Sequence, residues 1–180
     1  MLLELSIGIW SAVFISYYFG EELTVSFVLL GVLFAKLMDV DFIIYLFKNN
    51  WKVDQFAHEH RDIFHYPILY SFGGCIVFVY FSYSALAALW LLASLGHFVC
   101  DTFFGGWGIR WLSPFCNWYF CFANYSPKKI IKTKNEQRRI AEKYGDSNWL
   151  KNNSKLSFTL FRDLTIFLLS AVFALFVLFY

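Results

Sequence analysis

Five apolar stretches, separated by polar segments of very different lengths, dominate the hydrophobic pattern of this chain of 180 residues. A run of about 20 apolar residues is long enough to cross a bilayer as an α-helix. The pattern predicts about five transmembrane helices, at residues 5–19, 24–47, 67–81, 85–104 and 158–180. Because only Ser82, Tyr83 and Ser84 separate the third and fourth, these two should form a tight antiparallel hairpin. We therefore expect an all-α, polytopic integral membrane protein whose residues 1–180 form a single membrane domain.

The composition agrees with a membrane protein and argues against a soluble domain. Hydrophobic residues make up 59% of the chain and charged residues 16%, whereas about a quarter of the residues in a soluble domain are charged. Aromatic residues reach 23%, which is typical of surfaces that face lipid or the membrane interface. Membrane lipids are therefore expected partners.

Residues 105–157 form a long polar connection that is strongly basic. Three acids are set against ten basic residues there, namely Arg110, Lys128, Lys129, Lys132, Lys134, Arg138, Arg139, Lys143, Lys151 and Lys155. Basic loops stay in the cytoplasm, so this loop, the loop at residues 48–66 and the N-terminus should all be cytoplasmic. The segment from Lys128 to Lys143 is compatible with a helix and suits anionic lipid headgroups. No base-reading motif accompanies it, so no nucleic acid partner is expected.

Carboxylates and histidines in or beside the apolar segments are the candidate chemistry. These residues are Asp39, Asp41, His60, His65, His97 and Asp101. One Asp at the centre of a membrane helix costs roughly 2.5–3.5 kcal/mol on insertion scales, so the charges must be offset. The predicted topology brings all of them to the same depth near the cytoplasmic side. A metal ion held by imidazoles and carboxylates is the simplest way to neutralise them.

The spacing of these residues constrains how they can act together. His97 and Asp101 are four apart, so they share one face of a helix. Asp39 and Asp41 are two apart and would point to nearly opposite faces of a regular helix. Either only one of the two binds the metal, or the helix is distorted there. Alternatively, these two carboxylates could cap the end of a helix or lie at the membrane interface.

His60 and His65 are five apart and need an irregular segment to meet, which the loop provides. Mixed His and Asp ligands suit zinc and also accept manganese or iron. An open coordination position would lower the pKa of a bound water towards about 7 and so supply a nucleophile. Arg61 could hold an anionic substrate group such as a phosphate, or serve as one more positive charge of a cytoplasmic loop.

Four motifs occur in order, namely Asp39-Val40-Asp41, the stretch from His60 to His65, the stretch from His97 to Asp101, and a Gly-rich loop from Gly105 into Pro114-Phe115. This order resembles the YdjM-like membrane-bound, metal-dependent hydrolases over about the first two-thirds of the chain. The resemblance implies an inner-membrane location and phosphoester chemistry. The chain departs from the family pattern at Phe64-His65-Tyr66, where Thr-His-Ser is usual, and at Phe42, where a polar residue is common.

The leading hypothesis is a membrane-embedded hydrolase that uses a metal-activated water on an ester or phosphoester at the cytoplasmic leaflet. The substrate would be a small molecule or a lipid. The expected catalytic residues are Arg61 and Asp41, and the expected metal ligands are Asp39, His60, His65, His97 and Asp101. Two alternatives stay open, an ion-coupled transporter whose Asp and His residues bind a transported cation, and a non-catalytic membrane protein with a structural metal site.

Overall fold

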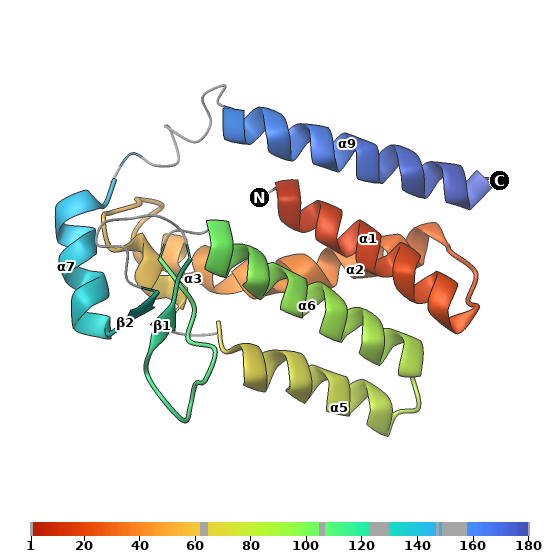
Figure 1. Cartoon of the computed structure of the whole chain (residues 1–180), viewed down its shortest axis with the longest axis horizontal. Coiled ribbons are helices and arrows are strands. Elements are labelled where there is room, and N and C mark those ends of the chain that lie inside the picture. The colour runs from red at the N-terminus through yellow and green to blue at the C-terminus, as the bar shows by residue number, and fades with distance from the viewer. Residues whose placement is uncertain are drawn as a thin grey trace. The chain divides into compact units, whose positions relative to one another are not determined.

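The computed structural model (Figure 1) describes residues 2–61, 65–104, 107–122, 130–146, 148 and 158–179. Helices account for most of these residues, in agreement with the predicted class. The chain divides into two compact units. The first unit comprises residues 1–37, 71–97 and 156–180, and the second comprises residues 38–70 and 98–155.

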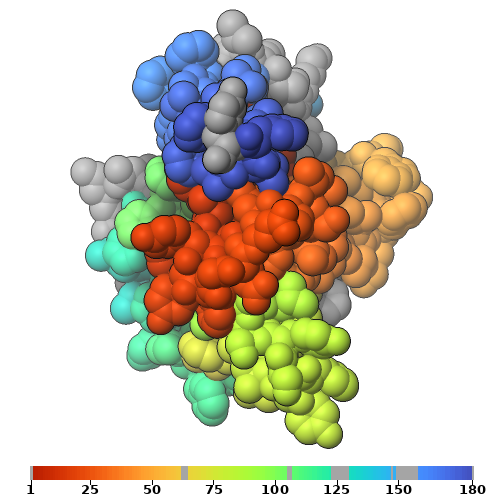
Figure 2. Space-filling model, turned by 90° about the vertical axis from the view of Figure 1, so that its right-hand side faces the viewer, coloured from red at the N-terminus to blue at the C-terminus, as the bar shows by residue number. Residues whose placement is uncertain are grey.

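The first unit consists of apolar helices of different lengths. They are α1 (Leu2–Phe19), α2 (Val25–Lys36), α5 (Gly73–Tyr80), most of α6 (Ser84–Phe104) and α9 (Phe158–Phe179). Helix α1 packs against both α2 and α9, and Figure 2 shows atoms of α9 directly against those of α1. Most apolar side chains of α9 are exposed, as expected of a helix that faces lipid. Within the described part of the chain, α1, α6 and α9 are long and apolar enough to cross a membrane.

The other two predicted spans are not continuous helices of spanning length. The second is interrupted after α2 by a 3₁₀ turn, η1 (Leu37–Asp39), and resumes as the short helix α3 (Val40–Lys48). The third begins with a π-helical turn, η3 (Ile68–Phe72), that leads into α5, and together they remain shorter than 18 residues. The interruption at η1 is the helix distortion that the spacing of Asp39 and Asp41 allowed for. No Gly or Pro lies at Leu37–Asp39, so the hydrophobic pattern does not reveal the interruption.

Helices α5 and α6 form the expected antiparallel hairpin within the first unit. The connection at Ser82 adopts a positive φ of 62°. The Ser94 hydroxyl donates a hydrogen bond of 2.9 Å to the Ser71 hydroxyl across the pair. The Trp90 ring packs over Gly74 and lies 5.1 Å from the Phe34 ring of α2, measured between centroids. The hairpin is thus closed by one buried polar contact and by aromatic packing.

Two glycines allow α1 and α2 to approach at backbone distance. A Cβ added at Gly8 would lie 2.5 Å from the Cα of Val32 and 2.6 Å from the carbonyl oxygen of Gly31. Backbone atoms cannot rotate away as a side chain can, so the helices would have to separate. The small residues therefore set the distance between the two helices.

Gly8→Ala should lower the free energy of unfolding by about 1–3 kcal/mol, the usual cost of overpacking, against a gain in helix propensity of at most about 1 kcal/mol. Gly73→Ala is the matched control, because nothing lies within 4 Å of its added Cβ. Thermal unfolding in detergent compares the two. Equal midpoints for both variants would contradict the close approach of α1 and α2.

The second unit is built from short elements. They are α3, η2 (Ala57–His60), β1 (Tyr119–Phe120), β2 (Ile131–Lys132) and α7 (Lys134–Tyr144), together with the C-terminal end of α6. The strands pair antiparallel, with Tyr119 opposite Lys132. This small sheet was not expected of an all-α chain.

Helix α7 forms most of the basic segment that the structure describes, and it begins at a capping box. The Thr133 side chain accepts a hydrogen bond from the Glu136 N–H, and the Glu136 carboxylate accepts one from the Thr133 N–H. This reciprocal pair fixes the first turn of the helix. The segment at Ile131–Lys132 is a strand, so the helix is shorter than expected. Lys128 and Lys129 lie outside the described residues.

Candidate functional site: a buried carboxylate and histidine cluster

Four predicted site residues meet inside the second unit. Asp41 lies at the start of α3, His60 ends η2, His65 follows a few residues later, and Asp101 lies in the last turn of α6. The side chains of Asp41 and His65 are enclosed, with relative exposures of 0% and 1%. Charged and polar groups this deeply buried require partners, and the cluster provides them for one another.

The Asp41 carboxylate lies between the two histidines. Its Oδ2 accepts a hydrogen bond of 2.7 Å from Nδ1 of His65. Its Oδ1 lies 3.9 Å from Nε2 of His60, is buried, and has no hydrogen-bond partner among the residues that the structure describes. This oxygen is therefore placed where it could bind a metal ion together with Nε2 of His60.

His65 extends the cluster to a buried ion pair. Its Nε2 lies 3.3 Å from Oδ2 of Asp101, while Oδ1 of Asp101 accepts a hydrogen bond of 3.0 Å from Nη2 of Arg61. The Arg61 and Asp101 side chains are only 14% and 9% exposed. Asp41, His65, Asp101 and Arg61 therefore form one continuous polar chain.

The hydrogen bonds of the two histidines fix which ring nitrogen could bind a metal. His60 donates through Nδ1 to the carbonyl oxygen of Ala57, which leaves Nε2 on the side of Asp41. His65 donates through Nδ1 to Asp41, which directs Nε2 away from that carboxylate. Metal-binding histidines usually donate their second nitrogen to a carbonyl or a carboxylate in this way, which orients the ring.

The donor set fits a divalent transition metal. The candidate ligand atoms of Asp41, His60 and His65 lie within 4.8 Å of one another, and so do those of Asp39 and His65. Two imidazoles with one carboxylate suit zinc, and manganese and iron accept the same ligands. A metal ion bound by these residues would explain why Oδ1 of Asp41 is buried without a hydrogen-bond partner among the described residues.

The two histidines differ in their protonation. Burial lowers the pKa of His60 to about 4, because an imidazolium loses its hydration, and the neighbouring charge of Arg61 acts in the same direction. Burial also opposes protonation of His65, but hydrogen bonds to Asp101 and Asp41 outweigh it and raise its pKa to about 8. Near neutral pH, His60 is thus a neutral donor of an electron pair, while His65 holds a proton between two carboxylates.

These pKa values predict how the stability of the metal-free protein depends on pH. The pKa of His65 is raised on folding, so its contribution is complete below pH 6.5 and is lost as the pH rises through about 8. The pKa of His60 is lowered, so its contribution is complete above pH 6.5 and is lost as the pH falls through about 4. Unfolding of the chelator-treated protein across this range should show a maximum near pH 6.5. His65→Gln should flatten the alkaline side, and an unchanged alkaline slope in that variant would refute the assignment.

The remaining predicted residues lie around this cluster. Asp39 occupies the position before α3 but, within the described part of the chain, makes no side-chain capping hydrogen bond, which argues against a simple helix cap. His97 is fully buried in α6, one helical turn before Asp101, and belongs to the first unit. Asp62, Ile63 and Phe64 of the second motif, and Gly105 and Gly106 of the fourth, lie outside the described residues.

Aromatic residues that depart from the family pattern contact the cluster or its neighbours. The Phe42 ring meets the edge of the His60 ring at a centroid distance of 5.0 Å. The Tyr66 hydroxyl accepts a hydrogen bond of 2.7 Å from Nη2 of Arg110, whose guanidinium also lies 4.8 Å from the centre of the same ring. Sequence reasoning noted both aromatic positions but missed these contacts, because ring packing leaves no spacing signal.

Comparisons with known proteins assign the chain to a family. No curated protein and no solved structure matches it. The family model described as YdjM inner membrane protein matches residues 5–178, which is nearly the whole chain and includes every residue of the cluster. The match agrees with the apolar helices and the motif order, and it extends beyond the two-thirds of the chain that the motifs cover. The chain belongs to the YdjM inner membrane protein family.

Proposed function

We propose that this inner-membrane protein is a metal-dependent hydrolase that acts on a phosphoester at the cytoplasmic leaflet. The observation that carries the proposal is the buried Asp41 carboxylate between two histidines, with one oxygen unpartnered among the described residues. The excess of basic residues in the 105–157 segment supports the cytoplasmic orientation of the site.

His60, His65 and Asp41 would hold the metal, and Asp39 would add a carboxylate beside His65. When bound, a divalent ion such as zinc would activate a water molecule and polarise a phosphoryl oxygen. The contribution of His97 stays a prediction.

The protein's own side chains position the proposed metal ligands and the substrate. Asp41 accepts the Nδ1 proton of His65 and so orients its ring, and Arg61 holds the Asp101 carboxylate that faces Nε2 of His65. With a metal at Nε2, His65 would act as a ligand and not as a proton donor. Arg61 has two further guanidinium nitrogens, Nε and Nη1, that are buried without a hydrogen-bond partner in the described part of the chain. These two atoms are available to an anionic oxygen of a substrate.

The proposal is tested by measuring the metal content and the hydrolytic activity of the purified full-length protein in detergent. Elemental analysis should find one zinc or manganese per chain, and hydrolysis of a chromogenic phosphodiester should stop on chelation and return on reloading. A tightly held ion without hydrolysis of any phosphoester or phospholipid tested would favour a structural metal site. An ion that exchanges within seconds would favour a transporter, and no ion after reconstitution would reject the site.

A further inference from the structure

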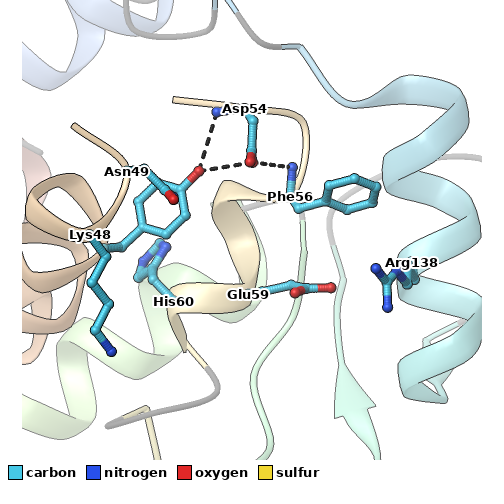
Figure 3. Close-up of a pocket in the computed structure, with 8 residues that line it drawn as sticks. Lys48, Asn49, Asp54, Phe56, Glu59, His60 and Arg138 are labelled. Atoms are coloured by element: carbon cyan, nitrogen blue, oxygen red, sulfur yellow. Dashed lines mark hydrogen bonds between the residues drawn. The ribbon is translucent and has the colours of Figure 1, made fainter. Parts of the chain in front are cut away.

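A pocket of about 300 Å³ lies beside His60 and is built entirely by residues of the second unit. Its volume is at the lower end of the range for small-molecule sites. Figure 3 shows Lys48 at one side and Arg138 of α7 at the other, with Glu59 and His60 between them. Because His60 belongs to the cluster described above, a molecule in this pocket would lie next to the proposed metal site.

One of the two carboxylates in the pocket wall is already used by the fold. Asp54 accepts hydrogen bonds of 2.8 Å from the Tyr45 hydroxyl and of 2.8 Å from the Phe56 N–H. These bonds hold the loop that follows α3. The negative charge of Asp54 is therefore a structural part of the wall.

The other carboxylate, Glu59, is available to a ligand. Its side chain makes no hydrogen bond and no ion pair with any residue that the structure describes. In Figure 3 it points across the pocket towards Arg138. The Arg138 guanidinium lies 5.3 Å from the centre of the Phe56 ring, which supports it from one side. The pocket thus presents two cations from different elements, one available carboxylate and aromatic faces.

This arrangement suits a ligand with both signs of charge. The guanidinium fork of Arg138 suits a phosphate, and the ammonium group of Lys48 on the other side of the pocket adds to the positive charge. A nearby ammonium group of the ligand is favoured by a carboxylate and by aromatic faces. A purely anionic ligand would face Glu59 unfavourably, and a purely cationic one would face Lys48 and Arg138.

We infer that this pocket binds the headgroup of a zwitterionic phosphoester of the phosphoethanolamine class, with the phosphate at Arg138 and the amine at Glu59, which points towards Arg138 in Figure 3. The inference names the substrate class of the proposed hydrolase and rests on that function for the reaction, whereas binding itself requires no turnover. The headgroup can come from a membrane lipid or from a soluble phosphoester, since both present the same chemistry.

The experiment measures binding of O-phosphoethanolamine to the chelator-treated full-length protein in detergent, by titration calorimetry, with inorganic phosphate as a second ligand. Arg138→Gln should weaken binding of both ligands by about tenfold or more, because a charge-assisted contact is lost. Glu59→Gln should weaken binding of O-phosphoethanolamine only. Arg139→Gln is the matched control, because Arg139 is an exposed neighbour on α7 that does not line the pocket.

Equal binding in the Arg138 and Arg139 variants would overturn the inference, as would loss of both ligands to the same extent in Glu59→Gln. Competition by micelles that contain phosphatidylethanolamine or phosphatidylglycerol shows whether the natural ligand is a lipid or a soluble phosphoester. Competition by the first lipid alone indicates a lipid headgroup, and absence of competition by either indicates a soluble phosphoester. Selective binding without metal-dependent hydrolysis would refute the proposed function but leave the binding inference intact. Metal-dependent hydrolysis without selective binding would refute the binding inference but leave the proposed function intact.

Discussion

Asp41→Asn should reduce the affinity of the protein for the proposed metal ion by at least about 100-fold. Loss of groups that only orient a ligand already costs about 10- to 100-fold, and Asp41 would be both a ligand and the partner of the second ligand, His65. The substitution keeps the shape of the side chain, and the asparagine oxygen can still accept the hydrogen bond from Nδ1 of His65. The fold should therefore persist while the charge that binds the ion is lost.

Elemental analysis and competition with a chelator of known affinity measure this loss. Asp163→Asn is the matched control, because Asp163 is paired with Arg162 at 2.7 Å in α9, outside the cluster. The control should retain wild-type metal content. If Asp41→Asn kept the ion with unchanged affinity, Asp41 would not be a ligand, and the donor set would have to be built without it.

Asp101→Ala should lower the free energy of unfolding by about 3–5 kcal/mol, the usual cost of removing one partner of a buried ion pair. The substitution leaves the mostly buried Arg61 guanidinium without its carboxylate and removes the contact at Nε2 of His65. Two groups of the cluster therefore lose a partner at once.

A double-mutant cycle separates this cost from the loss of packing. Combining Asp101→Leu with Arg61→Met should recover much of the stability, because no buried charge then remains unpaired. Chemical unfolding in detergent, followed by Trp fluorescence, provides all four free energies. A cost below about 1 kcal/mol for Asp101→Ala would show that the Arg61 charge reaches water and that the pair is not buried.

The hydrophobic pattern located the long helices because an uninterrupted apolar run of spanning length has few alternatives. It predicted α1, α6 and α9 to within a few residues. It could not reveal the break at Leu37–Asp39, where no Gly or Pro marks the interruption. It also missed the two-residue strands β1 and β2, which are too short to show an alternating pattern.

The cluster was predictable for an energetic reason. Histidines and carboxylates in apolar segments are costly unless partnered, so their presence marked Asp41, His65 and Asp101 as candidates. Their pairing was not predictable, because the contact of Arg61 with Asp101 joins residues 40 positions apart. The sequence therefore predicted that Asp41, His60, His65 and Asp101 come together, but not that Arg61 pairs with Asp101.

The sequence did not predict the pocket, because its charged residues have a simpler explanation. Arg138 belongs to a run of basic residues for which a membrane anchor is a sufficient explanation, and a single member with a different role has no signature there. Only the position of α7 in the fold and the contact of Arg138 with Phe56 place this guanidinium at the pocket.

Helix α7 contributes a wall of the pocket but none of the candidate metal ligands of the second unit. Its capping box holds that wall independently of the cluster. Under the proposed function, substitutions in this one surface helix can therefore change which headgroup is accepted while the proposed metal site stays unchanged. Members of the family should accordingly diversify in substrate through this helix first, and it is the natural place to begin redesigning specificity.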